Sequence, residues 1–403
     1  MNLNDAQRRM LDGEDGEIVQ RLMRLLVRLG QIYEADQMLE ITSAQISGVS
    51  YKSLGDPGLL FLEDIANAGV QIHPKVLAYA NPAGMDLEDW EKMGVPRDFA
   101  TKQIRIINAF RSMGVIPSTT CTPYLAGNLP CFGQHIAWAE SSAVSFANSV
   151  IGARTNREGG PSALAAAICG CTPNHGLHLD ANRTPTMLVQ VDFSPRSRAD
   201  FGALGYAVGE RVKDGIPYFR GIQTAGLDDF KALGAAMAAS GAIALYHVEG
   251  LTPEAHLCHP NGLDSFCVDS EALVRVYEKL NTTTEPERIV LGCPHASLGE
   301  IQEIAHKLEG KRLGKPLIIC TSRTVKQIAT EAGLTEIIRR AGGSVVADTC
   351  MVVAPIEKMG FNATAVNSGK AANYLPGFCN QQVVFRNVDD LIAGALESEE
   401  THT

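Results

Sequence analysis

Apolar and charged residues alternate at helical spacing near the N-terminus. Between residues 5 and 35 apolar side chains recur every three or four positions, and Gly13 and Gly16 interrupt the run. This spacing predicts an amphipathic helix or a helix pair. From there to about residue 280, short β-like runs alternate with helical segments, and Gly or Pro stands at nearly every junction. The runs 76–80, 186–191 and 242–248 are examples, and such alternation is typical of an α/β protein.

The last third of the chain has the clearest pattern. Short apolar runs predict strands at 289–293, 316–320, 344–350, 363–368 and 382–385. Helical patterns occupy 298–308, 325–341 and 388–396. Buried strands separated by helices predict a doubly wound parallel sheet. We therefore expect an α/β protein with a larger region over 1–280, which has room for two subdomains, and a doubly wound domain over 281–403.

Composition and charge exclude several classes of function. The 403 residues contain 35 Lys plus Arg and 45 Asp plus Glu, a formal net charge of −10. An acidic chain without a basic cluster is a poor nucleic-acid binder, and no run approaches the ~18 apolar residues of a membrane span. The charged start lacks the apolar region of a secretory signal. With ten cysteines, this pattern favours a cytoplasmic protein with reduced or metal-bound thiols.

Four cysteines stand where chemistry is expected. Cys293, Cys320 and Cys350 end successive predicted strands, and Cys121 also follows an apolar run and opens a loop. Ligands of open α/β sheets bind beyond the carboxyl ends of the strands. Cys121, Cys293 and Cys350 could together hold an iron–sulfur cluster with one iron free of protein ligands. Scattered cysteines form no C-x₂-C motif, so spacing alone leaves that hypothesis open, and Cys320 competes for the same role.

The other cysteines favour packing roles. Cys169 and Cys171 form a C-x-C at the end of an apolar run of small residues, which indicates packing more than metal binding. Cys258 and Cys267 lie near two histidines without the paired spacing of a zinc site.

Three segments are rich in groups that bind anions. Residues 148–161 carry two guanidiniums and a Gly-Gly turn, residues 43–52 form a small-residue loop, and 367–370 add a hydroxyl and an ammonium. Such groups can capture a carboxylate or a phosphate. No Walker motif, no helix-opening G-x-G-x-x-G and no G-x-S-x-G is present, which argues against nucleotide binding and a serine hydrolase.

Eight segments, in order along nearly the whole chain, resemble the large catalytic subunit of the aconitase X family, an outlying branch of the aconitase superfamily. They are Met10–Gly13, Ile46–Lys52, Cys121–Tyr124, Ala137–Ala143, Asn148–Gly159, His247–Gly250, Gly292–His295 and Asn367–Tyr374. The resemblance implies several doubly wound α/β/α domains around a central cleft. It also implies a hydro-lyase, an iron–sulfur dehydratase whose cluster cysteines map onto Cys121, Cys293 and Cys350. We expect a 4Fe–4S cluster, which can be isolated as 3Fe–4S.

The family also implies a partner. Aconitase-type enzymes need a small swivelling domain that supplies a serine base, and this sequence ends at Ser398–Thr403 without length for one. We therefore expect the split type, completed by a separate small subunit, and a chain that is inactive alone. The split type resembles phosphomevalonate dehydratase, which converts (R)-5-phosphomevalonate to trans-anhydromevalonate 5-phosphate on a route to isoprenoids. The alternatives are cis-3-hydroxy-L-proline dehydration and, from another class, a non-catalytic iron-responsive binding protein.

Candidate residues for this chemistry follow from the polar segments. The catalytic candidates are Arg154, Ser368 and Lys370. The substrate-binding candidates are Gly48, Val49, Ser50, Asn148, Arg154, Thr155, Asn156 and Ser322. A phosphorylated hydroxy acid would need such groups at both of its anionic ends.

Overall fold

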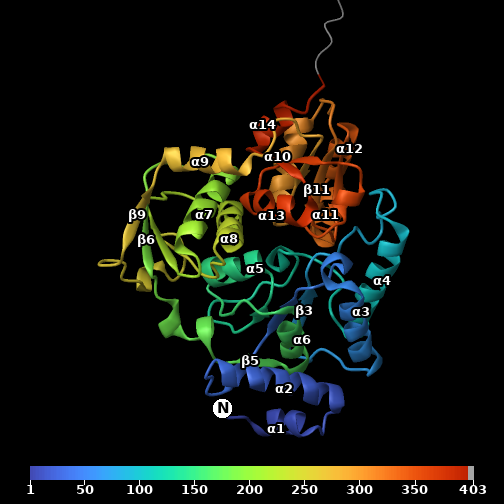
Figure 1. Cartoon of the computed structure of the whole chain (residues 1–403), viewed down its shortest axis with the longest axis vertical. Coiled ribbons are helices and arrows are strands. Elements are labelled where there is room, and N and C mark those ends of the chain that lie inside the picture. Colours follow the sequence, from blue (N-terminus) through green and yellow to red (C-terminus); the bar gives the residue numbers. More distant parts are fainter. Residues whose placement is uncertain (398–403) are drawn as a thin grey trace, which may run out of the picture.

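Three parallel sheets with flanking helices make up the computed structural model, which describes residues 1–397 (Figure 1). The first sheet has the order β3-β2-β4. Its strands are β2 (Ser43–Ile46), β3 (Leu77–Ala80) and β4 (Ala137–Trp138), and a separate antiparallel pair joins β1 (Met38–Glu40) to β5 (Cys171–Pro173). The helices of this region are α1 (Asp5–Asp12), α2 (Glu17–Ile32), α3 (Tyr51–Asn67), α4 (Arg97–Ser112), α5 (Ser141–Phe146) and α6 (Gly160–Cys169). The predicted N-terminal helix pair is confirmed, and the left-handed Gly13 ends α1.

The second sheet is four-stranded, with the order β8-β7-β6-β9. It consists of β6 (Met187–Val191), β7 (Pro217–Arg220), β8 (His247–Val248) and β9 (Ser265–Val268), accompanied by α7 (Arg198–Val212), α8 (Leu227–Ser240) and α9 (Ser270–Leu280). Small residues let α7 and α8 pack closely, because a Cβ at Gly205 would collide with the Leu233 carbonyl oxygen.

The predicted strand 242–248 is wrong over most of its length, since only β8 pairs. Ala242 has a positive φ of 62°, which breaks the extended backbone. The Ala244 carbonyl and the Tyr246 amide instead bond to the side chains of Asn148 and Ser149. These side chains therefore replace a neighbouring strand as hydrogen-bond partners.

The third sheet has five strands in the order β12-β11-β10-β13-β14. The strands are β10 (Arg288–Leu291), β11 (Leu317–Thr321), β12 (Gly343–Ala347), β13 (Ala363–Val366) and β14 (Gln382–Phe385). The helices are α10 (Leu298–Leu308), α11 (Arg323–Glu331), α12 (Leu334–Arg340), α13 (Gly369–Cys379) and α14 (Val388–Ala393). The predicted doubly wound parallel sheet is confirmed, whereas the helix expected over 325–341 is two helices, because Gly333 is left-handed between them.

The helices α5, α8 and α13 pack together at the centre of the molecule, where the three regions meet (Figure 1). Gly202 of α7 and Gly369 of α13 approach so closely that a Cβ at Gly369 would press on the Gly202 carbonyl. This packing places the N-termini of α5 and α13 beside each other. None of the helices in residues 1–397 is long and apolar enough to cross a membrane.

Candidate active site

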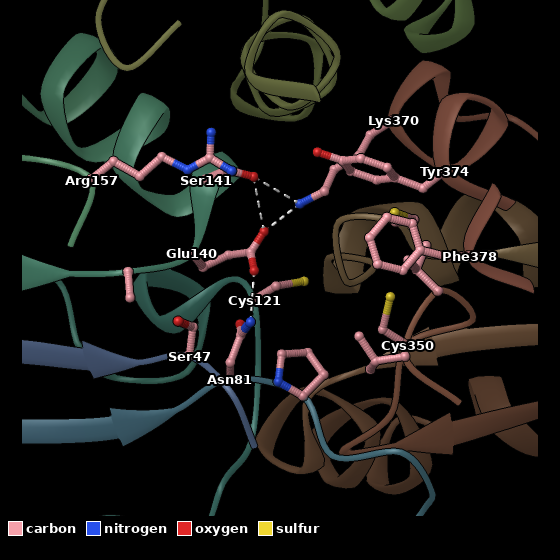
Figure 2. Close-up of a pocket in the computed structure, with 15 residues that line it drawn as sticks. Ser47, Asn81, Cys121, Glu140, Ser141, Arg157, Cys350, Lys370, Tyr374 and Phe378 are labelled. Carbon is pink, nitrogen blue, oxygen red and sulfur yellow. Dashed lines mark hydrogen bonds and ion pairs between the residues drawn. The ribbon is translucent and has the colours of Figure 1, made fainter. Parts of the chain in front are cut away.

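A cavity of about 280 Å³ opens between α5, α13 and the loop that follows β12 (Figure 2). Its lining combines thiols, charged groups and aromatic rings. The polar and thiol residues are Ser47, Asn81, Cys121, Glu140, Ser141, Arg157, Cys293, Cys350 and Lys370, and the rings are Tyr374 and Phe378. The cavity therefore draws its chemistry from both the first and the third region of the chain.

Three free, buried cysteines occupy the same cavity. Cys293 follows the end of β10 and Cys350 follows β12, while Cys121 lies in the loop after α4. Gly292 makes the turn into Cys293 with a φ of +91°, and a Cβ there would collide with the Cys320 carbonyl oxygen. The structure thus brings together the three cysteines that the sequence analysis selected. Cys320 is buried in β11 and is not part of the lining.

His295 connects the three cysteine-bearing segments. Its backbone N–H points at Cys121 Sγ, 3.1 Å away, and its Nε2 donates to the Thr349 carbonyl at 2.7 Å. Its Nδ1 accepts from the Thr120 hydroxyl at 2.9 Å. Burial lowers the pKa of His295 to about 4, so the ring is neutral and serves as one donor and one acceptor. Through its backbone amide and its ring, this residue fixes the relative positions of the three cysteine loops.

The donor set suits an iron–sulfur cluster better than a single metal ion. Within residues 1–397 no three His, Cys, Asp or Glu side chains lie close enough to grip one ion. Cluster cysteines bind different irons, so their sulfurs are farther apart than the ligands of one ion. Burial raises the pKa of the Cys121 thiol well above its usual value, so a bound cation must displace its proton. Three thiols on one cavity fit that group.

Beside the cysteines, the polar wall of the cavity is formed by an ion pair between Glu140 and Lys370. Lys370 Nζ also lies 3.3 Å from the hydroxyls of Ser141 and Ser142, and Asn81 Nδ2 donates to Glu140 Oε2 at 2.7 Å. Burial alone would raise the pKa of Glu140, but the Lys370 ammonium outweighs it and lowers that pKa to about 2. The same pairing raises the pKa of Lys370 although burial opposes the shift. Both groups are therefore charged at neutral pH.

Both residues of this pair lie at the N-terminus of a helix, and both line the cavity. Glu140 is the residue before α5, which directly follows the short strand β4. Ser368 caps α13 by accepting from the Ala371 amide at 3.1 Å, and Lys370 stands in the first turn. Ser368 is outside the cavity lining and acts on the backbone. The N-terminal ends of α5 and α13 thus carry the negative and the positive charge of the pair.

A second charged cluster joins the first and third regions behind Cys350. The Arg323 guanidinium contacts both Asp86 and Asp348, which are fully buried. Asp86 Oδ2 also accepts from the Ala347 amide at 2.8 Å. The Asp348 carbonyl accepts from the Thr119 hydroxyl at 2.9 Å. These bonds tie the end of β12 to the loop of Cys121.

The structure does not bring Arg154 to the cavity lining. Its guanidinium is engaged by Asp180, by Glu254 and by the Gly152 carbonyl. Asn148 holds the backbone of Thr155 through both its amide nitrogen and its oxygen. Asn156 donates to the His175 carbonyl at 3.0 Å. These four predicted residues support the loop that carries Arg157, and Arg157 is the member of the segment that lines the cavity.

In the small-residue loop, the predicted residues Gly48, Val49 and Ser50 likewise do not line the cavity. Ser50 donates to the Val353 carbonyl at 2.7 Å, and the Val49 carbonyl accepts from Gln103. Gly48 makes a left-handed turn, with a φ of 77°, and Ser47 beside it lines the cavity. Ser322 is a buried cap of α11 that accepts from Val325, and it does not reach the lining. The sequence analysis therefore identified both loops, but the residues that line the cavity are Ser47 and Arg157, next to the predicted ones.

The sequence reasoning missed several lining residues. They are Ser47, Asn81, Glu140, Ser141, Arg157, Tyr374 and Phe378. The signal that could have found Glu140 is its position after β4, the same strand-end rule that selected the cysteines. That strand is only two residues long, so no alternating pattern marks it. Tyr374 and Phe378 recur four apart on α13, which reads as ordinary core spacing.

Comparison with known proteins agrees with this fold. Models of the first, second and third domains of aconitase X match residues 1–181, 185–278 and 286–397. A solved structure described as aconitase X from Thermococcus kodakaraensis, in its holo-form, has a TM-score of 0.92 and 46% sequence identity, covering 98% of this chain and 100% of that one. The chain belongs to the aconitase X family, and the predicted aconitase-like α/β fold is confirmed. The division at residue 280 stays a prediction.

Two groups of relatives differ in how they align. Phosphomevalonate dehydratase large subunits from Methanocaldococcus jannaschii and Methanothermobacter thermautotrophicus are 54% and 52% identical, over 98% and 97% of this chain and 100% and 98% of their own lengths. Cis-3-hydroxy-L-proline dehydratase from Hypocrea jecorina is 30% identical, over 98% of this chain but 69% of its own length. The large subunits therefore match nearly end to end.

Proposed function

We propose that this chain is the large catalytic subunit of a hydro-lyase that dehydrates (R)-5-phosphomevalonate to trans-anhydromevalonate 5-phosphate. The observation that carries the proposal is one cavity lined by three thiols and by the largely buried Glu140–Lys370 pair. The choice of substrate is supported by the relatives at 46–54% identity, all named phosphomevalonate dehydratase large subunits. The hydroxyproline dehydratases, at 30–32% identity, are more distant.

Cys121, Cys293 and Cys350 would hold an iron–sulfur cluster of the 4Fe–4S type, which the aconitase relationship favours. When bound, the cluster would supply a Lewis acid that makes the substrate hydroxyl a better leaving group.

The chain's own polar residues would bind and orient the substrate. Arg157 presents an exposed guanidinium at the cavity, suited to bidentate capture of the phosphate or the carboxylate. Lys370 holds a buried positive charge that favours an anion beside it, and Glu140 keeps this ammonium in place. Ser368 and Arg154 act through the groups they position. Fixed orientation of this kind is worth several kcal/mol in catalysis.

A separate small subunit would complete the site and supply the serine that removes the proton α to the carboxylate. The proposal is supported by the name "large subunit" shared by the full-length relatives, and by the longer hydroxyproline dehydratases, of which this chain covers 68–69%. The C-terminal residues on which the expectation of a missing domain was based, 398–403, lie outside the described residues.

The test is an anaerobic assay of the chain co-purified with the small subunit. 5-Phosphomevalonate and cis-3-hydroxy-L-proline are offered side by side, and the dehydrated products are identified by mass spectrometry. We expect turnover of the phosphorylated substrate only, and none by the isolated chain. Turnover of hydroxyproline alone would overturn the proposed substrate, and full activity of the isolated chain would overturn the two-subunit site.

A further inference from the structure

A buried cluster of charges lies outside the cavity lining but is bonded to the loop that carries Arg157. Arg154, Arg183 and Glu254 have exposed fractions of 8%, 4% and 6%. Arg154 comes from the loop after α5, whereas Glu254 follows β8 in the second region. A buried carboxylate between two guanidiniums is costly to desolvate, and partner removal is strongly destabilising. This cluster joins the first region of the chain to the second, and the loop that it holds in the first region carries Arg157.

Glu254 is the centre of the cluster. Its Oε1 lies 2.8 Å from the Arg154 guanidinium, and its Oε2 lies 2.5 Å from that of Arg183. Arg183 donates in turn to the Asn148 side-chain oxygen at 3.1 Å and to the Asn148 carbonyl at 3.0 Å. Asn148 then brackets Thr155, accepting from its amide at 3.1 Å and donating to its carbonyl at 2.9 Å. A continuous chain of bonds therefore runs from Glu254 to a residue two positions before Arg157.

The two residues adjacent to Arg157, Asn156 and Glu158, are anchored as well. The Asn156 side-chain oxygen accepts from the Leu177 amide at 2.8 Å. The Glu158 amide donates to the Trp138 carbonyl at 3.0 Å, and its carboxylate accepts from Ser162. Arg157 itself points toward the Glu140–Lys370 pair, and no dashed line joins it to another residue drawn (Figure 2). Its neighbours are fixed while its guanidinium stays available.

We propose that Glu254 is a positioning residue for substrate binding: through Arg154, Arg183 and Asn148 it holds the loop 152–158 so that Arg157 faces the cavity. The inference rests on the proposed function insofar as Arg157 binds the substrate anion. A merely structural ion cluster would stabilise the fold but would not be coupled to Arg157. Coupling between Glu254 and Arg157 is therefore the property to measure.

The experiment is a double-mutant cycle in the complex with the small subunit, using Glu254→Gln, Arg157→Ala and the double variant. Glu254→Gln should raise the KM for 5-phosphomevalonate about tenfold with kcat nearly unchanged, and it should add nothing in the Arg157→Ala background. Glu249→Gln is the matched control, because Glu249 forms an exposed pair with Arg220 in the same segment and should leave KM unchanged. Independent, multiplicative effects of the two changes would overturn the proposal.

Hydrogen–deuterium exchange of residues 152–158 provides a readout that needs no substrate. Glu254→Gln should accelerate exchange there, and Glu249→Gln should not; unchanged exchange would overturn the inference. If Glu254→Gln fails to fold, Arg154→Lys replaces it, since lysine keeps the charge but cannot form the forked contacts. A complex that does not turn over 5-phosphomevalonate would refute the proposed function. The hydrogen–deuterium exchange of residues 152–158 would then be the test of the positioning role.

Discussion

The two walls of the cavity are built by different means. The cysteine wall stands at strand ends, where Gly292 makes the turn and His295 binds both other cysteine segments. The polar wall stands at two helix starts and is held by the Glu140–Lys370 ion pair. Backbone geometry thus fixes the sulfurs, whereas charge balance fixes the polar groups. We infer that loss of a cysteine removes the cluster, whereas loss of a charge in the polar wall impairs catalysis while the iron is retained.

Replacing a cysteine gives the largest expected effect. Cys350→Ala removes one of the three thiols, so iron content should drop sharply and dehydratase activity should fall to background in the complex. Iron analysis and the visible spectrum of the anaerobic protein measure this. The exposed Cys131 provides the control, because Cys131→Ala should change neither quantity. A Cys350→Ala protein with full iron content would contradict the assignment of this wall.

The polar wall should respond to loss of one charge. Lys370→Met leaves Glu140 buried without its partner, which costs about 3–5 kcal/mol of stability. The kcat/KM should fall about 10²–10³-fold, because a fixed positive charge at the site is lost. Iron content should stay normal, in contrast to the cysteine variant.

The matched control for the polar wall is Lys358→Met, an exposed lysine on the neighbouring loop. Thermal unfolding and steady-state kinetics provide the readouts. Loss of iron in Lys370→Met would show that the two walls are not independent and would break the comparison.

The charged cluster behind Cys350 should have an intermediate effect. Asp86→Asn weakens the contacts of Arg323 and the Ala347 amide that hold the end of β12. Supporting groups of this kind change metal affinity about 10–100-fold. Iron loss to a chelator should therefore be faster than in the unmodified protein. Asp89→Asn, on the more exposed side of the same cluster, should behave normally, and equal rates for both variants would contradict this role.

The smallest effect concerns acid stability. Burial alone would raise the pKa of Asp86, but the amides of Ala347 and Glu88, together with Lys326, outweigh it and hold that pKa below its usual range. A lowered pKa stabilises the fold above the unfolded value of about 3.9, and the stabilisation disappears as pH falls toward the folded pKa. The difference in urea midpoint between the unmodified protein and Asp86→Asn should shrink as the pH falls below about 4. A difference constant at all pH values would contradict this.

The sequence predicted one wall better than the other for a physical reason. Strands β10 and β12 contain the apolar runs 289–291 and 345–347, so their carboxyl ends, and hence Cys293 and Cys350, can be located from the pattern. Arg157 and Arg154 share one polar loop, and contacts with Asp180 and Glu254, which only the tertiary fold supplies, engage Arg154. Nothing local distinguishes them. Ala242 likewise broke a predicted strand through a backbone angle that composition does not reveal.

The most direct test of the account is an alkylation footprint of the anaerobically reconstituted protein. Iron and sulfide are quantified, and cysteine modification of the folded protein is mapped by mass spectrometry before and after chelation. We predict bound iron and sulfide, with Cys121, Cys293 and Cys350 protected until the iron is removed and Cys131 modified throughout. A protein without iron after reconstitution, or protection of a different set of cysteines that is lost on chelation, would contradict the central claim.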